Sequence, residues 1–354
     1  MSKTKLAVIF GGISTEHDVS IVSGTSVIEN LNKEKYEIYP IYISKNGKWN
    51  KYTKNIDEIA TLNIKEEINE IEEIQDVIGY LKQMDVIFPV LHGIGGEDGT
   101  IQGIFELIKV PYVGCGVLSS SVGMDKVYSK IIFEKAKIDQ AKYEYIRKNK
   151  ENYIYIDKQF NEKEYTIREI CEIMENNLKY PIFIKPSNSG SSVGVKKAKN
   201  KKELKQAIEY ASNYDSKILI EQGIKGRELE CAVLGNEEII ASCVGEILPA
   251  EEFYSFDAKY TNQESKTVIP ARVNEKVQAE IKDKAKKAFK AIDGKGLSRV
   301  DFFLEDETNK IYINEINTLP GFTKISMYPK LFEQQGINYK ELLDMLINLA
   351  KFNK

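Results

Sequence analysis

Short apolar runs alternate with helix-like segments in the first third of the chain. The runs at 5–10 (KLAVIF), 36–43 (YEIYPIYI) and 84–93 (MDVIFPVLHG) are rich in β-forming residues. Residues 14–31 have the pattern of a loop that enters a helix, and residues 100–108 have the pattern of a second helix. Strands that alternate with helices predict a parallel sheet with crossover connections. We therefore expect an α/β domain at the N-terminus.

The first helix has a recognisable start, whereas a later part of this domain is harder to interpret. Thr15 and Asp18 fit a capping box, in which two side chains satisfy the first backbone N–H groups of a helix. Residues 56–83 are mostly charged and predict helical or irregular structure.

Chemically useful side chains follow two of these strands. Glu16 and His17 lie in the loop after the first strand, and His92 lies in the loop after the third; the chain has no other histidine. Parallel sheets place ligands at the carboxyl ends of their strands. Both loops are therefore candidate site loops.

The rest of the chain predicts antiparallel strands and helices. The expected strands are 180–186, 216–224, 226–235 and 237–247, the last three as successive antiparallel neighbours; the expected helices are 201–212, 276–292 and 337–352; residues 298–317 predict a hairpin. Residues 139–180 show no readable pattern. Residues 248–270 form a long polar and aromatic loop, and loops of this length are usually functional or disordered.

Composition indicates a soluble chain of two or three domains. It has 354 residues, of which 42% are hydrophobic and 29% charged, with a net charge of −3. The absence of a strongly basic half argues against a nucleic-acid binder. No apolar run approaches the roughly 20 residues of a membrane span. The four cysteines (Cys115, Cys171, Cys231 and Cys243) form no CxxC pair, so we expect neither a zinc site nor a redox dithiol and place the chain in the cytoplasm.

The predicted hairpin carries the strongest local signal. Glu315 and Asn317 are two apart on one strand and share a face, and Asp301 on the partner strand can meet them. Three such oxygen ligands suit Mg²⁺. The alternative is an exposed polar strand face. Arg299 shares the face of Asp301 and suits a carboxylate or phosphoryl oxygen, or else makes a structural ion pair.

Residues 184–195 (IKPSNSGSSVGV) form the second candidate. Glycines let a backbone approach a phosphate, and successive N–H groups can bind an anion. SNSGSSVG within it is not a GxxxxGK[ST] loop and no helix starts directly after it; VGVKK (193–197) instead looks like a strand. A hairpin with a glycine-rich tip over phosphates fits this pattern, as does a plain turn. Lys185 could add a positive charge.

Together these stretches resemble the D-alanine–D-alanine ligases of the ATP-grasp superfamily. The resemblance covers nearly the whole chain except 44–83 and 139–180, and it is carried by VIFGGISTEHDVS, FPVLHGIGGEDGTIQG, GMDKVYSK, IKPSNSGSSVGV, EQGIKGRELECAVLG, FYSFDAKY, SRVDFF, INEINTLPGFT and ISMYP. It implies an ATP-grasp fold: an N-terminal parallel α/β domain (1–120), a central lobe with a glycine-rich flap (121–217) and a C-terminal lobe with the metal site and a lid loop (218–354).

The resemblance also implies which residues bind ATP between two antiparallel sheets. The matching positions are Lys126, Lys185 and Lys259 for the phosphates, Ser192 in the flap, Glu221, Gln222 and Ile224 for adenine, and Glu228 for the ribose.

The remaining implied roles concern metal and substrates. Asp301, Glu315 and Asn317 match ligands of two Mg²⁺ ions, for which Mn²⁺ can substitute. The first D-alanine is expected near Glu16 and His92, and the second near Arg299, Gly321, Ser326 and Met327. Glu16, Ser191 and Tyr260 match a hydrogen-bonded triad that joins the N-terminal domain, the flap and the lid.

The implied reaction makes D-alanyl-D-alanine for peptidoglycan precursors. A D-alanine carboxylate attacks the γ-phosphate of ATP to give an acyl phosphate, and the amine of the second D-alanine displaces phosphate. Arg299 and the Gly321 N–H would stabilise the oxyanion, and the loop around 254–260 would exclude water. The family is commonly dimeric, but no stretch of the sequence defines an interface.

The sequence departs from the family at a few positions. Gln222 stands where a lysine is frequent, and Phe256 where a tyrosine is common. Relatives that make D-Ala-D-Ser or D-Ala-D-lactate commonly have arginine at the position of Met327, so this residue points to D-alanine. Another carboxylate–amine ligase and a non-catalytic nucleotide-binding regulator remain alternatives. A dehydrogenase is disfavoured because no GxGxxG follows the first strand.

Overall fold

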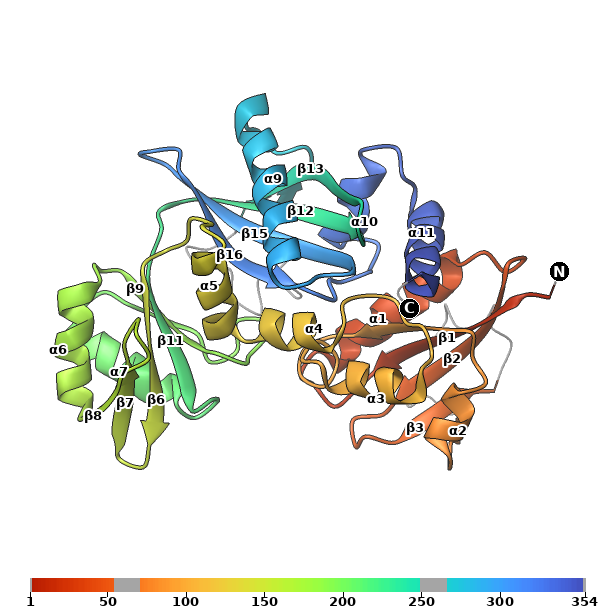
Figure 1. The fold of residues 1–354 in the computed structure, drawn as a ribbon, viewed down its shortest axis with the longest axis horizontal. Helices are drawn as coiled ribbons and strands as arrows, with labels where there is room; N and C mark the ends of the chain where they lie inside the picture. Colours follow the sequence, from red (N-terminus) through yellow and green to blue (C-terminus); the bar gives the residue numbers. More distant parts are fainter. Residues whose placement is uncertain (1, 54–70, 249–265, 353–354) are drawn as a thin grey trace.

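The computed structural model describes residues 2–53, 71–248 and 266–352. Figure 1 shows three lobes, which we call the first, second and third in chain order. They are built on a five-stranded sheet, a six-stranded sheet and another five-stranded sheet. The expected mixed α/β architecture is confirmed.

The first lobe has parallel strands at its centre. β1 (Thr4–Gly11) pairs in parallel with β2 (Tyr36–Ile43) on one side and with β5 (Val86–Leu91) on the other. The three predicted strands therefore form as expected. β3 (Trp49–Tyr52) and β4 (Ile71–Glu73) extend the sheet in antiparallel fashion, so the sheet is mixed rather than purely parallel.

Three helices belong to this lobe: α1 (His17–Asn30), α2 (Val77–Leu81) and α3 (Thr100–Ile108). The predicted capping box at Thr15 and Asp18 is wrong, because α1 begins after Glu16 and no side chain caps it. The Ser14 hydroxyl instead accepts the Glu16 N–H at 3.2 Å, so this hydrogen bond fixes the turn that precedes α1. The Glu16 carboxylate does not cap the helix and can bond to a residue outside it.

The second lobe contains the segment that the apolar pattern could not resolve. Its sheet has the order β10-β9-β11-β6-β7-β8, with β6 (Tyr143–Asn149), β7 (Asn152–Ile156), β8 (Glu162–Tyr165), β9 (Ile182–Pro186), β10 (Lys196–Ala198) and β11 (Lys217–Gln222). The helices are α6 (Ile167–Asn177), which starts at a Thr166–Glu169 capping box, and α7 (Lys201–Ala211). β9 and β10 form the predicted hairpin, and its tip is the glycine-rich flap, residues 187–195.

The third lobe carries the predicted acidic hairpin. Its sheet has the order β14-β13-β12-β15-β16, with β12 (Gly226–Gly235), β13 (Ile239–Leu248), β14 (Lys266–Val268), β15 (Gly296–Glu305) and β16 (Ile311–Asn317). Its helices are α9 (Glu275–Ala291), α10 (Met327–Glu333) and α11 (Tyr339–Lys351).

One strand assignment is corrected. β11 does not pair with β12, as three successive antiparallel strands would require, but lies between β6 and β9 in the second lobe. Residues 223–225 therefore connect two sheets instead of forming a hairpin turn. Two further helices, α4 (Val117–Met124) and α5 (Lys126–Lys135), lead from the first lobe to the second.

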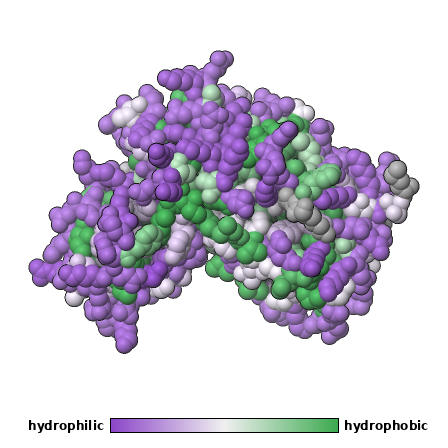
Figure 2. Space-filling model, viewed as in Figure 1, coloured by the Kyte–Doolittle hydropathy of each residue, from purple (hydrophilic) through white to green (hydrophobic). Residues whose placement is uncertain are grey.

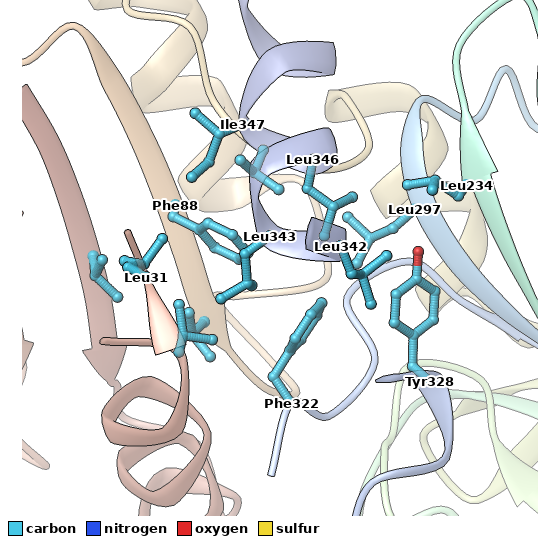
Figure 3. Close-up of a cluster of buried hydrophobic side chains, with 14 of the residues drawn as sticks. Leu31, Phe88, Leu234, Leu297, Phe322, Tyr328, Leu342, Leu343, Leu346 and Ile347 are labelled. Carbon is cyan, nitrogen blue, oxygen red and sulfur yellow. The ribbon is translucent and has the colours of Figure 1, made fainter. Parts of the chain in front are cut away.

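The first and third lobes share one hydrophobic core, drawn in Figure 3. Phe88 of the first lobe meets Phe322 edge to face, with ring centroids 5.8 Å apart. Phe322 in turn contacts Tyr328, whose hydroxyl donates to the Val233 carbonyl at 3.0 Å. Helix α11 contributes Leu343 and neighbouring residues to the same cluster. This side of the molecule is therefore one packed unit.

The second lobe has a core of its own between its sheet and the helices α6 and α7. Figure 2 shows hydrophilic side chains over most of the outer surface and apolar residues gathered mainly where the lobes meet.

Leu343→Ala should destabilise the shared core. The side chain is fully buried, and removing it leaves a cavity that costs about 2–5 kcal/mol. Urea unfolding followed by circular dichroism measures the effect. The matched control is Leu107→Ala, because Leu107 is 84% exposed, and we expect a change within about 0.5 kcal/mol. Equal effects of the two substitutions would contradict the shared core.

Candidate active site

A cavity of about 1470 Å³ lies where the three lobes meet. Its walls come from the start of α1, the loop after β5, the flap, the end of β11, the β15–β16 hairpin and the loop at 317–327. It is lined by every residue within the described ranges for which the resemblance implies a role, but not by His17. Lys259 and Tyr260 lie outside the described residues.

The Glu16 carboxylate connects the first lobe to the flap. Ser191 donates its hydroxyl to Glu16 Oε1 at 2.5 Å. A Cβ atom added at Gly93 or at Gly190 would lie 2.9 Å from the other oxygen, Oε2. A side chain at either glycine would therefore push the Glu16 carboxylate out of its present position. Two members of the predicted triad are thus in contact.

The flap tip has an unusual backbone. Ser191 and Ser192 both have positive φ angles, 49° and 60°, which non-glycine residues rarely adopt. The strained turn points the Ser191 hydroxyl at Glu16 and leaves Ser192 on the cavity wall. Lys126, at the start of α5, donates its ammonium to the Ser189 carbonyl at 2.5 Å and so holds the flap from the other side.

His92 is buried in a network that joins the first and third lobes. Its Nε2 lies 3.0 Å from the Ser23 hydroxyl and its Nδ1 lies 3.3 Å from the Leu319 carbonyl. Because a carbonyl only accepts, Nδ1 carries the proton and Nε2 accepts from Ser23. Burial lowers the pKa of His92, so its imidazole is neutral near pH 7. His17, the other candidate histidine, instead bonds to the Gly12 carbonyl and faces the Tyr42 hydroxyl at 3.2 Å.

Glu97 is a site residue that the sequence analysis missed. It lines the cavity, accepts the Gly93 N–H at 2.8 Å and lies 4.0 Å from His92 Nδ1. Burial and the charge of Glu16 raise the pKa of the Glu97 carboxyl to about 8. The signal was available in GGEDG, where an acid follows His92 at a short distance, but a turn explains that composition equally well.

Lys185 and Glu221 form the charged floor of the cavity. They are ion-paired, and Lys130 of α5 approaches the other Glu221 oxygen at 2.9 Å. Burial alone would raise the pKa of Glu221, but the two lysines outweigh it and bring the pKa to about 2. The side chain predicted to read adenine is therefore directed at lysines. Gln222 at the end of β11, Ile224 in the connector and Glu228 in β12 lie on the cavity wall.

The acidic hairpin has the register expected from the sequence. Asp301 is directly opposite Glu315, and Arg299 is opposite Asn317. The Arg299 guanidinium donates two hydrogen bonds of 2.7 Å each to the Asp301 carboxylate, and the Asn317 amide donates to Asp301 at 3.0 Å. Arg299 also lies 3.1 Å from Glu230. The structural ion pair considered for Arg299 is therefore present, at the edge of the cavity.

The three predicted metal ligands are two acids and one amide. Across the part of the chain that the structure describes, no three His, Cys, Asp or Glu side chains are grouped as metal ligands. Asp301 and Glu315 nevertheless lie directly opposite each other on paired strands, Asp301 buried and Glu315 half-buried, where further positive charge is favourable. A carboxylate, carboxylate and amide-oxygen set fits Mg²⁺.

The far end of the cavity is formed by the loop that leads into α10. The Ser326 hydroxyl accepts the Thr323 N–H at 3.0 Å. A Cβ atom at Gly321 would lie 2.8 Å from that hydroxyl, so glycine keeps the backbone open there. Met327 lies next to Ser326, is 6% exposed and presents an apolar wall.

Comparison with known proteins decides the family. Residues 5–115 match the model described as D-ala D-ala ligase N-terminus, and residues 133–348 match D-ala D-ala ligase C-terminus. The chain belongs to the D-alanine–D-alanine ligase family. A D-alanine–D-alanine ligase of Acetivibrio thermocellus is 50% identical over 98% of the chain and 96% of the relative. One from Caldicellulosiruptor bescii is 49% identical over 99% and 96%.

Solved structures of this ligase family have the same fold. The D-alanine-D-alanine ligase from Coxiella burnetii superposes with a TM-score of 0.86 at 32% identity, over 99% of the chain and 95% of that structure. The VanG D-Ala:D-Ser ligase from Enterococcus faecalis superposes with a TM-score of 0.85 at 37% identity, over 99% and 100%. The family resemblance inferred from the motifs is confirmed.

Two general features of the ligase chain complete the description. No helix within the described ranges is long and apolar enough to cross a membrane. All four cysteines are buried and none is in a disulfide.

Glu97 predicts a specific pH dependence of stability. The unfolded carboxyl titrates near 4.5 and the folded one near 8, so between these values the folded state holds a proton that the unfolded state has lost. The free energy of unfolding should therefore fall as pH rises from about 4.5 to about 8, with a slope of at most about 1.4 kcal/mol per pH unit from this group.

Urea unfolding of the wild type and of Glu97→Gln between pH 5 and 9 measures this slope. The Gln variant should lack the contribution, whereas Glu151→Gln, a change at an exposed acid, should keep it. Parallel pH profiles for the wild type and Glu97→Gln would contradict the shift.

Proposed function

We propose that this protein joins two D-alanine molecules to D-alanyl-D-alanine, a peptidoglycan precursor, with conversion of ATP to ADP and phosphate. The observation that carries the proposal is the convergence of widely separated motifs on one cavity. Glu16, His92, Lys185, Asp301 and Ser326 come from all three lobes and line the same space. Full-length relatives named D-alanine–D-alanine ligases support it.

The nucleotide would lie between the second and third lobes. Lys126 and Lys185 supply positive charge for its phosphates beneath the flap, which also offers Ser192. The connector from Gln222 to Ile224 would contact adenine through its backbone, since the Gln222 side chain accepts the Lys179 N–H at 3.1 Å and is turned away. Glu228 would meet the ribose, and Lys259 would meet the γ-phosphate.

Asp301, Glu315 and Asn317 would hold the two Mg²⁺ ions, or Mn²⁺ in their place. These cations neutralise phosphate charge during phosphoryl transfer. The Arg299 guanidinium already donates to both oxygens of the Asp301 carboxylate, so the arginine and the metals would share that carboxylate.

The first D-alanine would place its ammonium near Glu16 and its carboxylate near His92. Its carboxylate oxygen attacks the γ-phosphorus, ADP leaves, and an acyl phosphate forms. The amine of the second D-alanine then attacks the acyl carbon, loses a proton and expels phosphate. Arg299 and the Gly321 N–H would stabilise the oxyanion, which for one good donor is worth roughly 3–4 kcal/mol. Tyr260 would complete the Glu16–Ser191 pair and close the lid.

The second substrate has one specific alternative, D-serine, because the structurally similar VanG protein is a D-Ala:D-Ser ligase. The side chain at the relevant wall favours D-alanine: Met327 is apolar and buried, which suits a methyl group and offers nothing to a hydroxyl. We place the enzyme in the cytoplasm, with no nucleic-acid or membrane partner, and a homodimer remains the expectation from the family.

Phosphate release from ATP tests the proposed function. It should occur with D-alanine and not with L-alanine or with ATP alone. With equal D-alanine and D-serine, chromatography should show more D-Ala-D-Ala than D-Ala-D-Ser. ATP turnover without dependence on D-alanine would exclude the ligase, and an excess of D-Ala-D-Ser would exclude the role of Met327.

Asp301→Asn and Glu315→Gln should abolish the ligation activity, because each removes a charged oxygen ligand for Mg²⁺ while nearly preserving shape. Dipeptide formation at saturating Mg²⁺ measures the loss, which should reach at least about 100-fold, because changing even the outer-shell partners of metal ligands costs roughly 10–100-fold. The matched control is Asp283→Asn on the exposed face of α9, which should keep full activity. Near-normal turnover of either site variant would refute the metal assignment.

A further inference from the structure

Three largely buried charged side chains form a row at the wall of the cavity. Lys130 lies on α5, Glu221 on β11 and Lys185 on β9, so three elements contribute one residue each. Glu221 lies between the lysines and contacts both, with Lys130 Nζ 2.9 Å from Oε2 and Lys185 on Oε1. The exposed fractions of the side chains are 3% for Lys130, 6% for Glu221 and 13% for Lys185. Water therefore screens these charges weakly.

The two ends of the row face different surroundings. Lys185 and Glu221 line the cavity, whereas Lys130 does not. Lys130 faces the Tyr143 ring, with its ammonium 5.6 Å from the ring centroid. Lys130 therefore makes no contact with a nucleotide in the cavity and can act on it only through its charge and through its contact with Glu221.

Helix α5 is firmly set against the strands that carry its partners. The Asp125 carboxylate caps the helix by accepting the Val127 and Tyr128 N–H groups, and it also accepts the Ser187 hydroxyl at 2.6 Å and pairs with Lys217. These contacts tie the helix to β9 and β11. Residues four apart share a helix face, so Lys126 meets the flap while Lys130, one turn later, meets Glu221.

Charge counting shows what Lys130 adds. Glu221 is ionised across the neutral pH range, so on its own it would cancel the charge of Lys185. With Lys130 present, the row carries two positive charges and one negative charge. The net unit charge is then available to a polyphosphate in the cavity. An apolar residue could fill the volume of Lys130 without the cost of burying an ammonium group, so stability alone does not account for a lysine there.

We propose that Lys130 is a positioning residue that holds and neutralises Glu221, so that Lys185 keeps its positive charge for the phosphates of the nucleotide. This inference rests on the proposed function only in taking ATP as the ligand beside Lys185. It assigns to Glu221 the task of aiming Lys185, in place of reading adenine with its side chain.

Nucleotide binding to the full-length protein tests the proposal. Calorimetric titration should give a roughly tenfold weaker affinity of Lys130→Met for ATP, because one nearby unit charge is lost. The loss should decrease in the order ATP, ADP and AMP as phosphate charge decreases. The KM for D-alanine should not change. Lys135→Met, at an exposed lysine of the same helix, should bind all three nucleotides like the wild type.

The double variant Lys130→Met/Glu221→Gln separates charge from structure. It restores a net unit charge on Lys185, so its ATP affinity should recover to within about threefold of the wild type. A purely structural role for Lys130 predicts no recovery, because both polar partners are gone. An equal loss for ATP and AMP in the single variant, or a double variant as weak as the single one, would overturn the proposal.

Two further measurements, of folding and of wild-type activity, distinguish a failure of this proposal from a folding defect and from a failure of the proposed function. Thermal unfolding reports whether each variant folds, and Lys130→Gln replaces the Met variant if that one does not. If the wild-type protein binds ATP but forms no dipeptide, the proposed ligase function is refuted, but the ATP affinities of the variants still test the role of Lys130. Wild-type protein that binds no nucleotide would refute both.

Discussion

The apolar core shared by the first and third lobes is the constraint on which the site depends. Phe88, Phe322 and Tyr328 pack in sequence from the parallel sheet to the antiparallel one, and α11 fills the space beside them. The loops that carry His92 and Gly321 leave directly from this core. Close packing resists displacement, so the substrate side of the cavity is built on one rigid unit, although its residues are more than 200 positions apart in the chain.

The flap of the second lobe is held by different chemistry. The core of this lobe is separate, and the flap and the end of β9 make polar contacts with the rest of the site: Ser191 with Glu16, Ser189 with Lys126 and Lys185 with Asn314. Each of these hydrogen bonds involves a charged group, and bonds of this kind contribute about 1.5–3 kcal/mol each on balance. A flap joined in this way can be released and reformed far more easily than the substrate side, which suits a part that must admit and release a nucleotide.

Much of this arrangement could be predicted from the sequence, and the limits have physical causes. Period-two alternation placed Asp301, Glu315 and Asn317 on one face, because strand geometry is local. The same alternation does not determine which sheet an apolar strand joins. The sequence therefore predicts the wrong neighbours for β11, which pairs with β6 and β9. The capping box at Thr15 failed for a related reason: the turn before α1 is held by contacts with a distant loop, through Ser14 and the His92 carbonyl.

Residues whose role depends on burial were the hardest to find. Glu97 sits in a stretch that reads as an ordinary turn, and Lys130 reads as one of many helical lysines. Neither is unusual until the fold removes water from around it. The buried ammonium group of Lys130 then needs an acidic partner. Among the ion pairs of the described residues, Lys130 pairs only with Glu221. In a chain with so many lysines, the sequence does not show which of them are functional. Only the three-dimensional structure distinguishes a buried ammonium group from the solvated ones around it.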